Sequence, residues 1–170
     1  MKKIMFNDRY KLTELVLNGE KTMTRRVVKK KKQKKEDILE NSLYKIGDVI
    51  AIAQSYEKTE FKFRMLKGHL QNSPGWKNKL FVDPKLMPHH IKITGIKVEK
   101  LQDISEEDCL KEGIKCFPSD VMPDLYTFEG ASDNWNTAIE AFSNLIDKVS
   151  GKGTWESNPE VFCYTFNLID

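Results

Sequence analysis

The stretch "NGEKTMTRR", residues 18–26, decides how this chain is interpreted. Gly19 can end a helix, and the next seven residues contain one lysine, two threonines and two arginines. No apolar period runs through the stretch, so packing against a core does not explain it. An ammonium, two hydroxyls and two guanidiniums just past a helix end indicate a binding or catalytic site.

Length and composition predict one globular domain that spans residues 1–170. The chain is 39% hydrophobic and 31% charged, and its length allows a substantial buried core. No apolar run approaches the roughly 20 residues that cross a bilayer. The start "MKKIMFNDRY" has no apolar segment of a signal peptide. We therefore expect a cytoplasmic protein with no membrane partner.

The cysteines and histidines show no metal-ligand pattern. The cysteines are odd in number and form no C-x-x-C pair, which is typical of reduced thiols. The histidines have no acidic or cysteine partner at metal-ligand spacing. These six residues are Cys109, Cys116, Cys163, His69, His89 and His90. No G-x-G-x-x-G or phosphate-binding loop is present either. The sequence predicts no metal and no cofactor.

Positive charge is concentrated in one segment. The net charge is +3, with 28 basic and 25 acidic residues. Eight of the basic residues lie within residues 25–35: Arg25, Arg26, Lys29, Lys30, Lys31, Lys32, Lys34 and Lys35. Without them, 20 basic residues face 25 acidic ones. Such a segment favours phosphate backbones through counterion release. The alternative is a solvated lysine loop.

The first half of the chain predicts one short helix and several strands. Leu12, Leu15 and Val16 have helical spacing, and Gly19 would end that helix. The polar stretch then reads as a loop, followed by a strand that starts at Val27. A buried strand is expected at 49–52 and an alternating strand in "FKFRML", 61–66. Residues 67–88 are rich in Gly and Pro and should be irregular.

The second half predicts two strands and two helices. In "HIKITGIKVEKL", 90–101, Gly95 breaks the alternation and predicts a bulge or sharp bend. "ISEEDCLKEGI", 104–114, reads as a helix from Ser105 to Gly113. Residues 115–132 should form a loop.

The clearest helix of the sequence lies near the C-terminus. It is expected in 133–153, with Asp133 as its cap, and a last strand follows at 161–169. Short strands with helices gathered at the ends favour an α+β fold built on a small bent β-barrel.

Six motifs occur in order along the chain: "FN" at 6–7, "GEKTMTRR" at 19–26, "YKIGDVI" at 44–50, "MP" at 87–88, "LQDISEEDCLKEGI" at 101–114 and "GKGTWESNPEVFCYTF" at 151–166. Together they resemble the ASCH-domain family, in its long bacterial and phage form. The resemblance implies a PUA-like pseudobarrel with helices packed around it, and insertions at about 57–90 and 115–134. It also implies a cleft lined by the Lys21–Arg26 loop that binds RNA or a nucleotide-like ligand.

One branch of the family hydrolyses N4-acetylcytidine without a metal. Similarity to this branch implies a catalytic role for Lys21, Thr24 and Glu112. A threonine hydroxyl needs a base to accept its proton, and a lysine can be that base only if its pKa is lowered. Activation of water by Glu112, with Thr24 only binding the substrate, is equally consistent with these residues.

The binding interpretation, our first choice from the sequence, uses overlapping residues. Phosphates would contact Lys21, Arg25, Arg26 and the run Lys29–Lys32. Thr22 and Thr24 would donate hydrogen bonds, and Tyr56 would stack on a base. A structural alternative is that Thr24 and Glu112 brace the loop, with Arg25 or Arg26 in an internal salt bridge. We expect Lys21, Thr24 and Glu112 to converge in one cleft flanked by Tyr56; the oligomeric state is not predicted.

Overall fold

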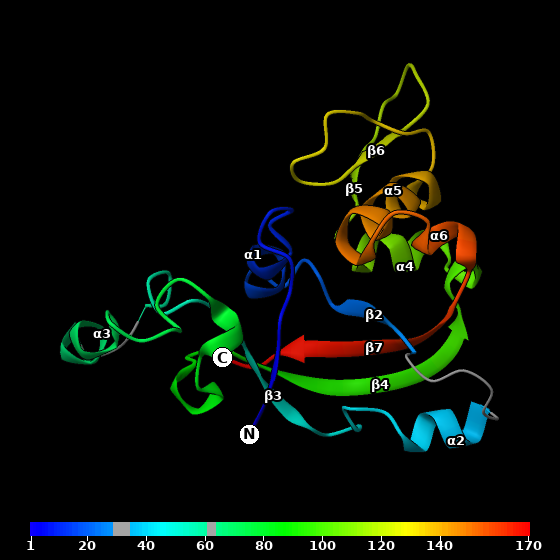
Figure 1. Ribbon diagram of the computed structural model, residues 1–170. Helices are drawn as coiled ribbons and strands as arrows, with labels where there is room; N and C mark the ends of the chain where they lie inside the picture. Colours follow the sequence, from blue (N-terminus) through cyan, green and yellow to red (C-terminus); the bar gives the residue numbers. More distant parts are fainter. Residues whose placement is uncertain (29–34, 61–63) are drawn as a thin grey trace.

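A five-stranded mixed sheet forms the centre of the molecule in the computed structural model, which describes residues 1–28, 35–60 and 64–170 (Figure 1). The strand order is β1-β3-β4-β7-β2. The strands are β1 (Lys2–Ile4), β2 (Met23–Val27), β3 (Val49–Ile52), β4 (His90–Lys100) and β7 (Glu160–Leu168). Strands β1 and β3 are parallel, whereas the other pairs are antiparallel. The fold class is α+β, as predicted.

The long strands β4 and β7 pair along most of their lengths and curve together (Figure 1). Their register shifts between Ile93 and Gly95, which confirms the predicted irregularity. Gly95 lies against β7 so closely that a Cβ built on it would be 2.4 Å from the Thr165 Oγ1. A residue without a side chain is therefore required where the strand bends.

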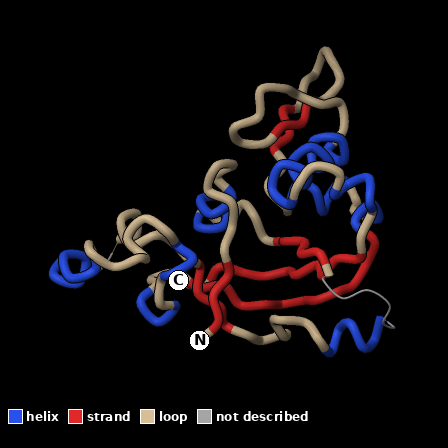
Figure 2. Tube along the Cα trace, viewed as in Figure 1, coloured by secondary structure: helices blue, strands red, loops and turns tan. Residues whose placement is uncertain are grey.

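Helices cover both faces of this sheet. In Figure 1, α1 (Leu12–Leu17), α4 (Glu106–Lys111), α5 (Ala138–Ser150) and α6 (Thr154–Ser157) lie above it. Helix α2 (Lys35–Glu40) lies on the other side. Figure 2 shows α3 (Arg64–Leu70) away from the sheet. Short 3-10 turns lie at Lys79–Phe81, Pro84–Leu86 and Leu101–Asp103.

The main core lies between the sheet and the helices above it. Ile50, Ile91 and Ile93 from the sheet belong to the same buried cluster as Phe142 and Leu145 of α5. Helix α5 begins at Ala138 rather than next to Asp133, because the Thr137 side chain accepts a hydrogen bond from the Glu140 N–H. This is the usual N-cap arrangement, and it corrects the predicted cap.

Two further expectations about local structure were wrong. Residues 64–66 belong to helix α3 rather than to a strand, and residues 61–63 lie outside the described part. Within the expected loop at 115–132, β5 (Lys115–Phe117) and β6 (Leu125–Thr127) form an antiparallel hairpin. Short alternating segments are compatible with either structure, so the contacts made elsewhere decide.

The sheet is open, with β1 and β2 at its two edges. The predicted small bent barrel is therefore not confirmed by the strand pairing. The chain after β1 nevertheless approaches β2, because the Arg26 Nη2 donates a hydrogen bond to the Met5 carbonyl oxygen at 2.6 Å. We call the gap between these two segments the seam. In the described residues, no helix has both the length and the apolar character needed to cross a bilayer.

Candidate functional site

Lys21 is held at the base of the site by the end of helix α1. Gly19 adopts a positive φ of 75° after the helix, and the Lys21 N–H donates to the Leu15 carbonyl. This turn directs the lysine side chain inward, where the residue is only 2% exposed. Its Nζ donates to the Glu112 Oε2 at 2.5 Å and to the Glu112 carbonyl oxygen at 2.7 Å. The two residues form a buried ion pair.

Glu112 reaches Lys21 because it occupies the C-cap of helix α4. Gly113 follows with a φ of 105°, which ends the helix as predicted. The Thr22 N–H donates to the Lys111 carbonyl at 3.0 Å, so backbone also joins the two segments. Two helix ends that are 91 positions apart in sequence thus meet at one point.

Thr24 lies on strand β2, not in a loop, and is buried. It pairs with Tyr164 of β7, which fixes its position in the sheet. Among the described residues, its hydroxyl has no hydrogen-bond partner. The hydroxyl is therefore available to a ligand, and Thr24 lines the same cavity as Lys21 and Glu112.

Arg25 is held inside an internal ion-pair cluster, which corrects its predicted role in ligand binding. Its side chain is fully buried and contacts the carboxylates of Glu99, Asp108 and Glu112 at 2.7, 2.9 and 3.2 Å. The structural alternative, an internal salt bridge, is thus correct for Arg25. Lys97 also contacts Glu99 and Asp108, from the solvent side.

These contacts determine the protonation of the cluster. Burial opposes the charge on Arg25, but Glu112 and Glu99 outweigh it, so the pKa of Arg25 is raised. Burial also lowers the pKa of Lys21, and Arg26 and Arg25 lower it further. Glu112 opposes this effect without cancelling it, so the pKa of Lys21 is below its ordinary value of 10.5. A lysine with a lowered pKa can serve as a base.

Arg26 differs from Arg25 in having no carboxylate partner among the residues that the structure describes. Its Nη2 bonds to the Met5 carbonyl, and its Cζ lies 5.7 Å from the centre of the Phe6 ring. Its buried Nε has no hydrogen-bond partner. Arg26 thus retains both an uncompensated charge and an unused donor.

The central cavity, as we call it, has a volume of about 660 Å³ and combines a polar floor with an apolar wall. Its floor consists of Lys21, Thr24, Arg25, Arg26 and Glu112. Helix α5 supplies the wall through Phe142, Leu145, Ile146 and Val149. Met5, Phe6 and Leu12 complete the apolar lining. The sequence predicted that the residues of the floor belong to a functional site. It predicted the apolar residues of α5 only as one face of a helix that packs against the core.

The other predicted ligand contacts do not meet at this cavity. Tyr56 is buried in a separate cluster with Val82 and Met87, and its hydroxyl accepts a hydrogen bond from the Asp83 N–H. It is therefore a core residue, not a stacking surface. Thr22 is not among the lining residues, although its backbone braces the loop. Residues Lys29, Lys30, Lys31 and Lys32 lie outside the described part of the chain.

Glu99, Asp108 and Cys163 are the one group in the described ranges whose geometry could hold a metal ion. Their ligand atoms lie within 4.8 Å of one another. However, Arg25 and Lys97 already contact both carboxylates. Burial raises the pKa of the Cys163 thiol to about 12, so the sulfur is protonated at neutral pH. These residues fit an ion-pair cluster better than a metal site.

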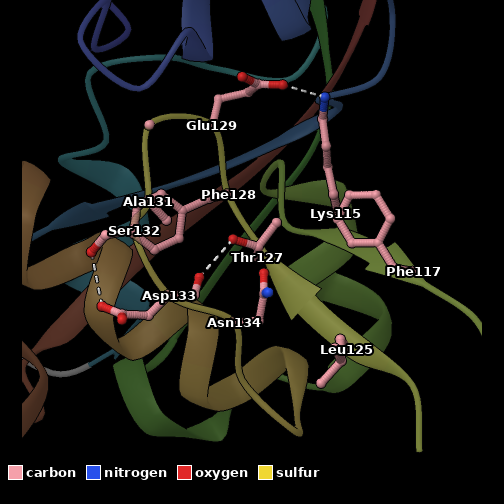
Figure 3. Close-up of a pocket in the computed structure, with 11 residues that line it drawn as sticks. Lys115, Phe117, Leu125, Thr127, Phe128, Glu129, Ala131, Ser132, Asp133 and Asn134 are labelled. Atoms are coloured by element: carbon pink, nitrogen blue, oxygen red, sulfur yellow. Dashed lines mark hydrogen bonds and ion pairs between the residues drawn. The ribbon is translucent and has the colours of Figure 1, made fainter. Parts of the chain in front are cut away.

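A second cavity, of about 600 Å³, lies beside the β5–β6 hairpin (Figure 3). Several of its polar side chains already form ion pairs or hydrogen bonds with neighbouring residues. The Lys115 ammonium contacts Glu129 at 2.5 Å, and the Thr127 hydroxyl donates to the Asp133 carbonyl at 2.9 Å. Ser132 donates to the Asp133 carboxylate at 3.0 Å. Because these groups are paired, this cavity is a weaker candidate than the central one.

Comparisons with known proteins add a structural likeness. No family model matches the chain, and no curated protein matches it. Among solved structures, it is similar to the crystal structure of protein EF3133 from Enterococcus faecalis V583, described with family model DUF984. The identity is 16%, the alignment covers 100% of this chain and 81% of that one, and the TM-score is 0.48. The interpretation of the site therefore rests on its own geometry.

Proposed function

We propose that this protein binds a nucleoside-like ligand in the central cavity and hydrolyses an acyl amide on its base. The observation that carries the proposal is the buried Lys21–Glu112 ion pair, which lies in the same cavity as Thr24. These are the three residues that similarity to the amidohydrolase branch of the ASCH family singles out. We extend the proposal to the fold: the open sheet, whose edges meet at Arg26 and Met5, would be a PUA-like pseudobarrel.

The cavity suits such a ligand in size and in character. Its volume of about 660 Å³ falls within the usual range for small-molecule sites. The α5 wall, which includes Phe142 and Ile146, offers an apolar surface to a planar base or to its acyl group. The polar floor supplies hydrogen-bonding groups, which the carbonyl oxygen and the leaving amine of such a substrate would need.

The lowered pKa of Lys21 favours a route through Thr24. Once the Lys21 ammonium has passed a proton to the Glu112 carboxylate, the Thr24 oxygen attacks the acyl carbonyl carbon and the neutral Lys21 amine takes the hydroxyl proton. Lys21 then gives that proton to the leaving amine as the C–N bond breaks. Water hydrolyses the threonyl ester to a carboxylic acid and restores Thr24. Glu112 orients Lys21 throughout, and Arg25 fixes the other oxygen of Glu112.

A second candidate is a nucleotide- or RNA-binding protein without chemistry. The specific observation in its favour is Arg26, whose guanidinium has no carboxylate partner in the described part of the chain. It could hold a phosphate, as the sequence predicted. Arg25 cannot contribute in this way, because its side chain is buried among three carboxylates.

An assay of N4-acetylcytidine hydrolysis separates the two candidates. The reaction contains a chelator, and chromatography measures the cytidine that is released. We expect turnover by the unaltered protein and a decrease in kcat of about 10²–10⁴-fold in Thr24→Val and in Lys21→Met. Thr22→Val is the matched control, since Thr22 lies two positions away and does not line the cavity. If the unaltered protein shows no turnover above Lys21→Met, the hydrolase proposal is wrong and the binding candidate remains.

A further inference from the structure

A third cavity, of about 630 Å³, adjoins the central one along the seam. The two cavities share Met5, Arg26 and Val27 as lining residues, so they meet at Arg26. Residues that precede Met5 and follow Val27 line the third cavity, whereas Phe6 and Thr24 line the central one. We call these two neighbouring cavities the compartments of one groove, and Arg26 lines both of them.

The third cavity is aromatic, and we call it the aromatic cavity. Tyr44, Phe162 and Tyr164 line it. Phe162 is only partly buried and is stacked on Tyr164, with ring centres 5.9 Å apart. Both tyrosine hydroxyls are already bonded, Tyr44 to the Lys3 carbonyl at 2.9 Å and Tyr164 to the Ser42 hydroxyl at 2.7 Å. Tyr44 and Tyr164 are buried in the core, so the partly buried Phe162 is the ring that offers an apolar surface to a ligand.

Arg26 supplies the polar group between the compartments. Its Nε is buried without a partner, and such donors are usually bonded in native proteins. Its neighbour Arg25 is neutralised by three carboxylates, whereas no acid among the described residues pairs with Arg26. The position calls for an anionic acceptor. A guanidinium that keeps an unbonded Nε beside its Nη2–Met5 bond is suited to a phosphate.

We propose that the groove binds two linked nucleotides across Arg26. The acylated nucleoside occupies the central cavity, the bridging phosphate contacts Arg26, and the neighbouring base stacks in the aromatic cavity beside Phe162. This inference rests on the proposed function and specifies its substrate, which is a nucleoside within a strand rather than a free one. Because the tyrosine hydroxyls are occupied, the neighbouring base is recognised by stacking and its identity matters little.

Two pairs of ligands test the inference. The first is kcat/KM for N4-acetylcytidine compared with dinucleotides that join it to adenosine on either side. The second is the affinity for cytidine compared with the corresponding unmodified dinucleotides. We expect the better dinucleotide to exceed the nucleoside by about tenfold or more in both measurements, since stacking alone contributes roughly that factor. Added salt should reduce the preference, because it depends on a phosphate.

Substitutions test which residues cause the preference for the dinucleotide over the nucleoside. Arg26→Gln should bring the ratio of dinucleotide to nucleoside affinity close to one and remove its salt dependence. Phe162→Leu should lower the ratio but leave the salt dependence. Lys92→Gln, which removes an exposed charge on β4 away from the groove, should change neither. A dinucleotide preference without any hydrolysis would contradict the proposed chemistry alone. Equal affinities for nucleoside and dinucleotide, or a preference that survives Arg26→Gln, would overturn this inference.

Discussion

Arg25 and Arg26 are adjacent in the chain, yet their surroundings give them opposite roles. Strand geometry sends alternate side chains to opposite faces, so one guanidinium enters the carboxylate cluster and the other faces the seam. Arg25 fixes Glu112, and Glu112 fixes Lys21. The protonation and the position of the proposed base therefore depend on Arg25, whose side chain is fully buried.

Removing Arg25 should cost much of the stability of the fold. Arg25→Met would leave three carboxylates without their central partner, and breaking a buried pair in this way lowers the free energy of unfolding by about 3–5 kcal/mol. Urea unfolding followed by circular dichroism measures the loss. The control is Lys97→Met, which removes a half-exposed cation from the same carboxylates and should cost under about 1 kcal/mol. Equal losses in the two variants would mean that burial of the cluster contributes nothing.

The same cluster predicts how stability depends on pH. Burial raises the pKa of Asp108, but hydrogen bonds from Arg25 and Lys97 outweigh it and hold the pKa below the ordinary 3.8. Asp108 therefore stabilises the fold above that pH, and the contribution is lost as pH falls through the lowered pKa. Asp108→Asn should reduce the free energy of unfolding at pH 7, and the difference should shrink below about pH 4.

Urea titrations at a series of pH values check this expectation. Asp103→Asn is the control, since Asp103 is exposed and takes no part in the cluster. A deficit for Asp108→Asn that is the same at pH 3 and at pH 7 would show that the effect is not electrostatic.

Among the strands, β4 depends most clearly on one small residue. Gly95 lies at the register shift, where a Cβ would collide with the Thr165 Oγ1. Gly95→Ala should lower the free energy of unfolding by about 1–3 kcal/mol, as is typical of overpacking. Thr165→Ala in the same chain should restore part of this loss, because it removes the colliding atom. A double-mutant cycle measures the coupling, and strictly additive effects would argue against the contact.

The elements that sequence predicted well are those governed by local chemistry. Gly19 and Gly113 end helices α1 and α4 because each adopts a positive φ, and Gly95 marks the bulge in β4. Local signals failed where distant partners decide the structure. The polar stretch becomes strand β2 only because it pairs with β7, which begins at Glu160. Residues 64–66, the end of the segment expected to be a strand, are helical instead.

The same distinction separates the predicted and the unpredicted parts of the site. Lys21, Thr24 and Glu112 could be anticipated from motifs, and Lys21 and Glu112 are in direct contact. The burial of Arg25 could not be anticipated, because its partners Glu99 and Asp108 are 74 and 83 positions away. Tyr56 has an aromatic ring that could stack on a base, but it packs against Val82 and Met87 and is therefore a core residue.

At the scale of the whole molecule, the fold brings together segments that lie far apart in the sequence. Residues at the end of α1, at the end of α4, on strand β2 and on one face of α5 all line one cavity. Arg26 bonds to the Met5 carbonyl across the seam, between strand β2 and the chain after β1. Within the described residues, these two edges of the sheet are joined by this side chain and not by a strand pair.

The central claim is that the cavity above Lys21 and Glu112 holds an acylated nucleoside, and a ligand-bound crystal structure tests it most directly. Crystals of Thr24→Val soaked with N4-acetylcytidine should retain the uncleaved substrate, because the proposed nucleophile is absent. We predict electron density for the base against α5, with the acetyl carbonyl next to Lys21 and residue 24. Density only in the hairpin cavity, or an acetyl group that points away from Lys21, would contradict the account.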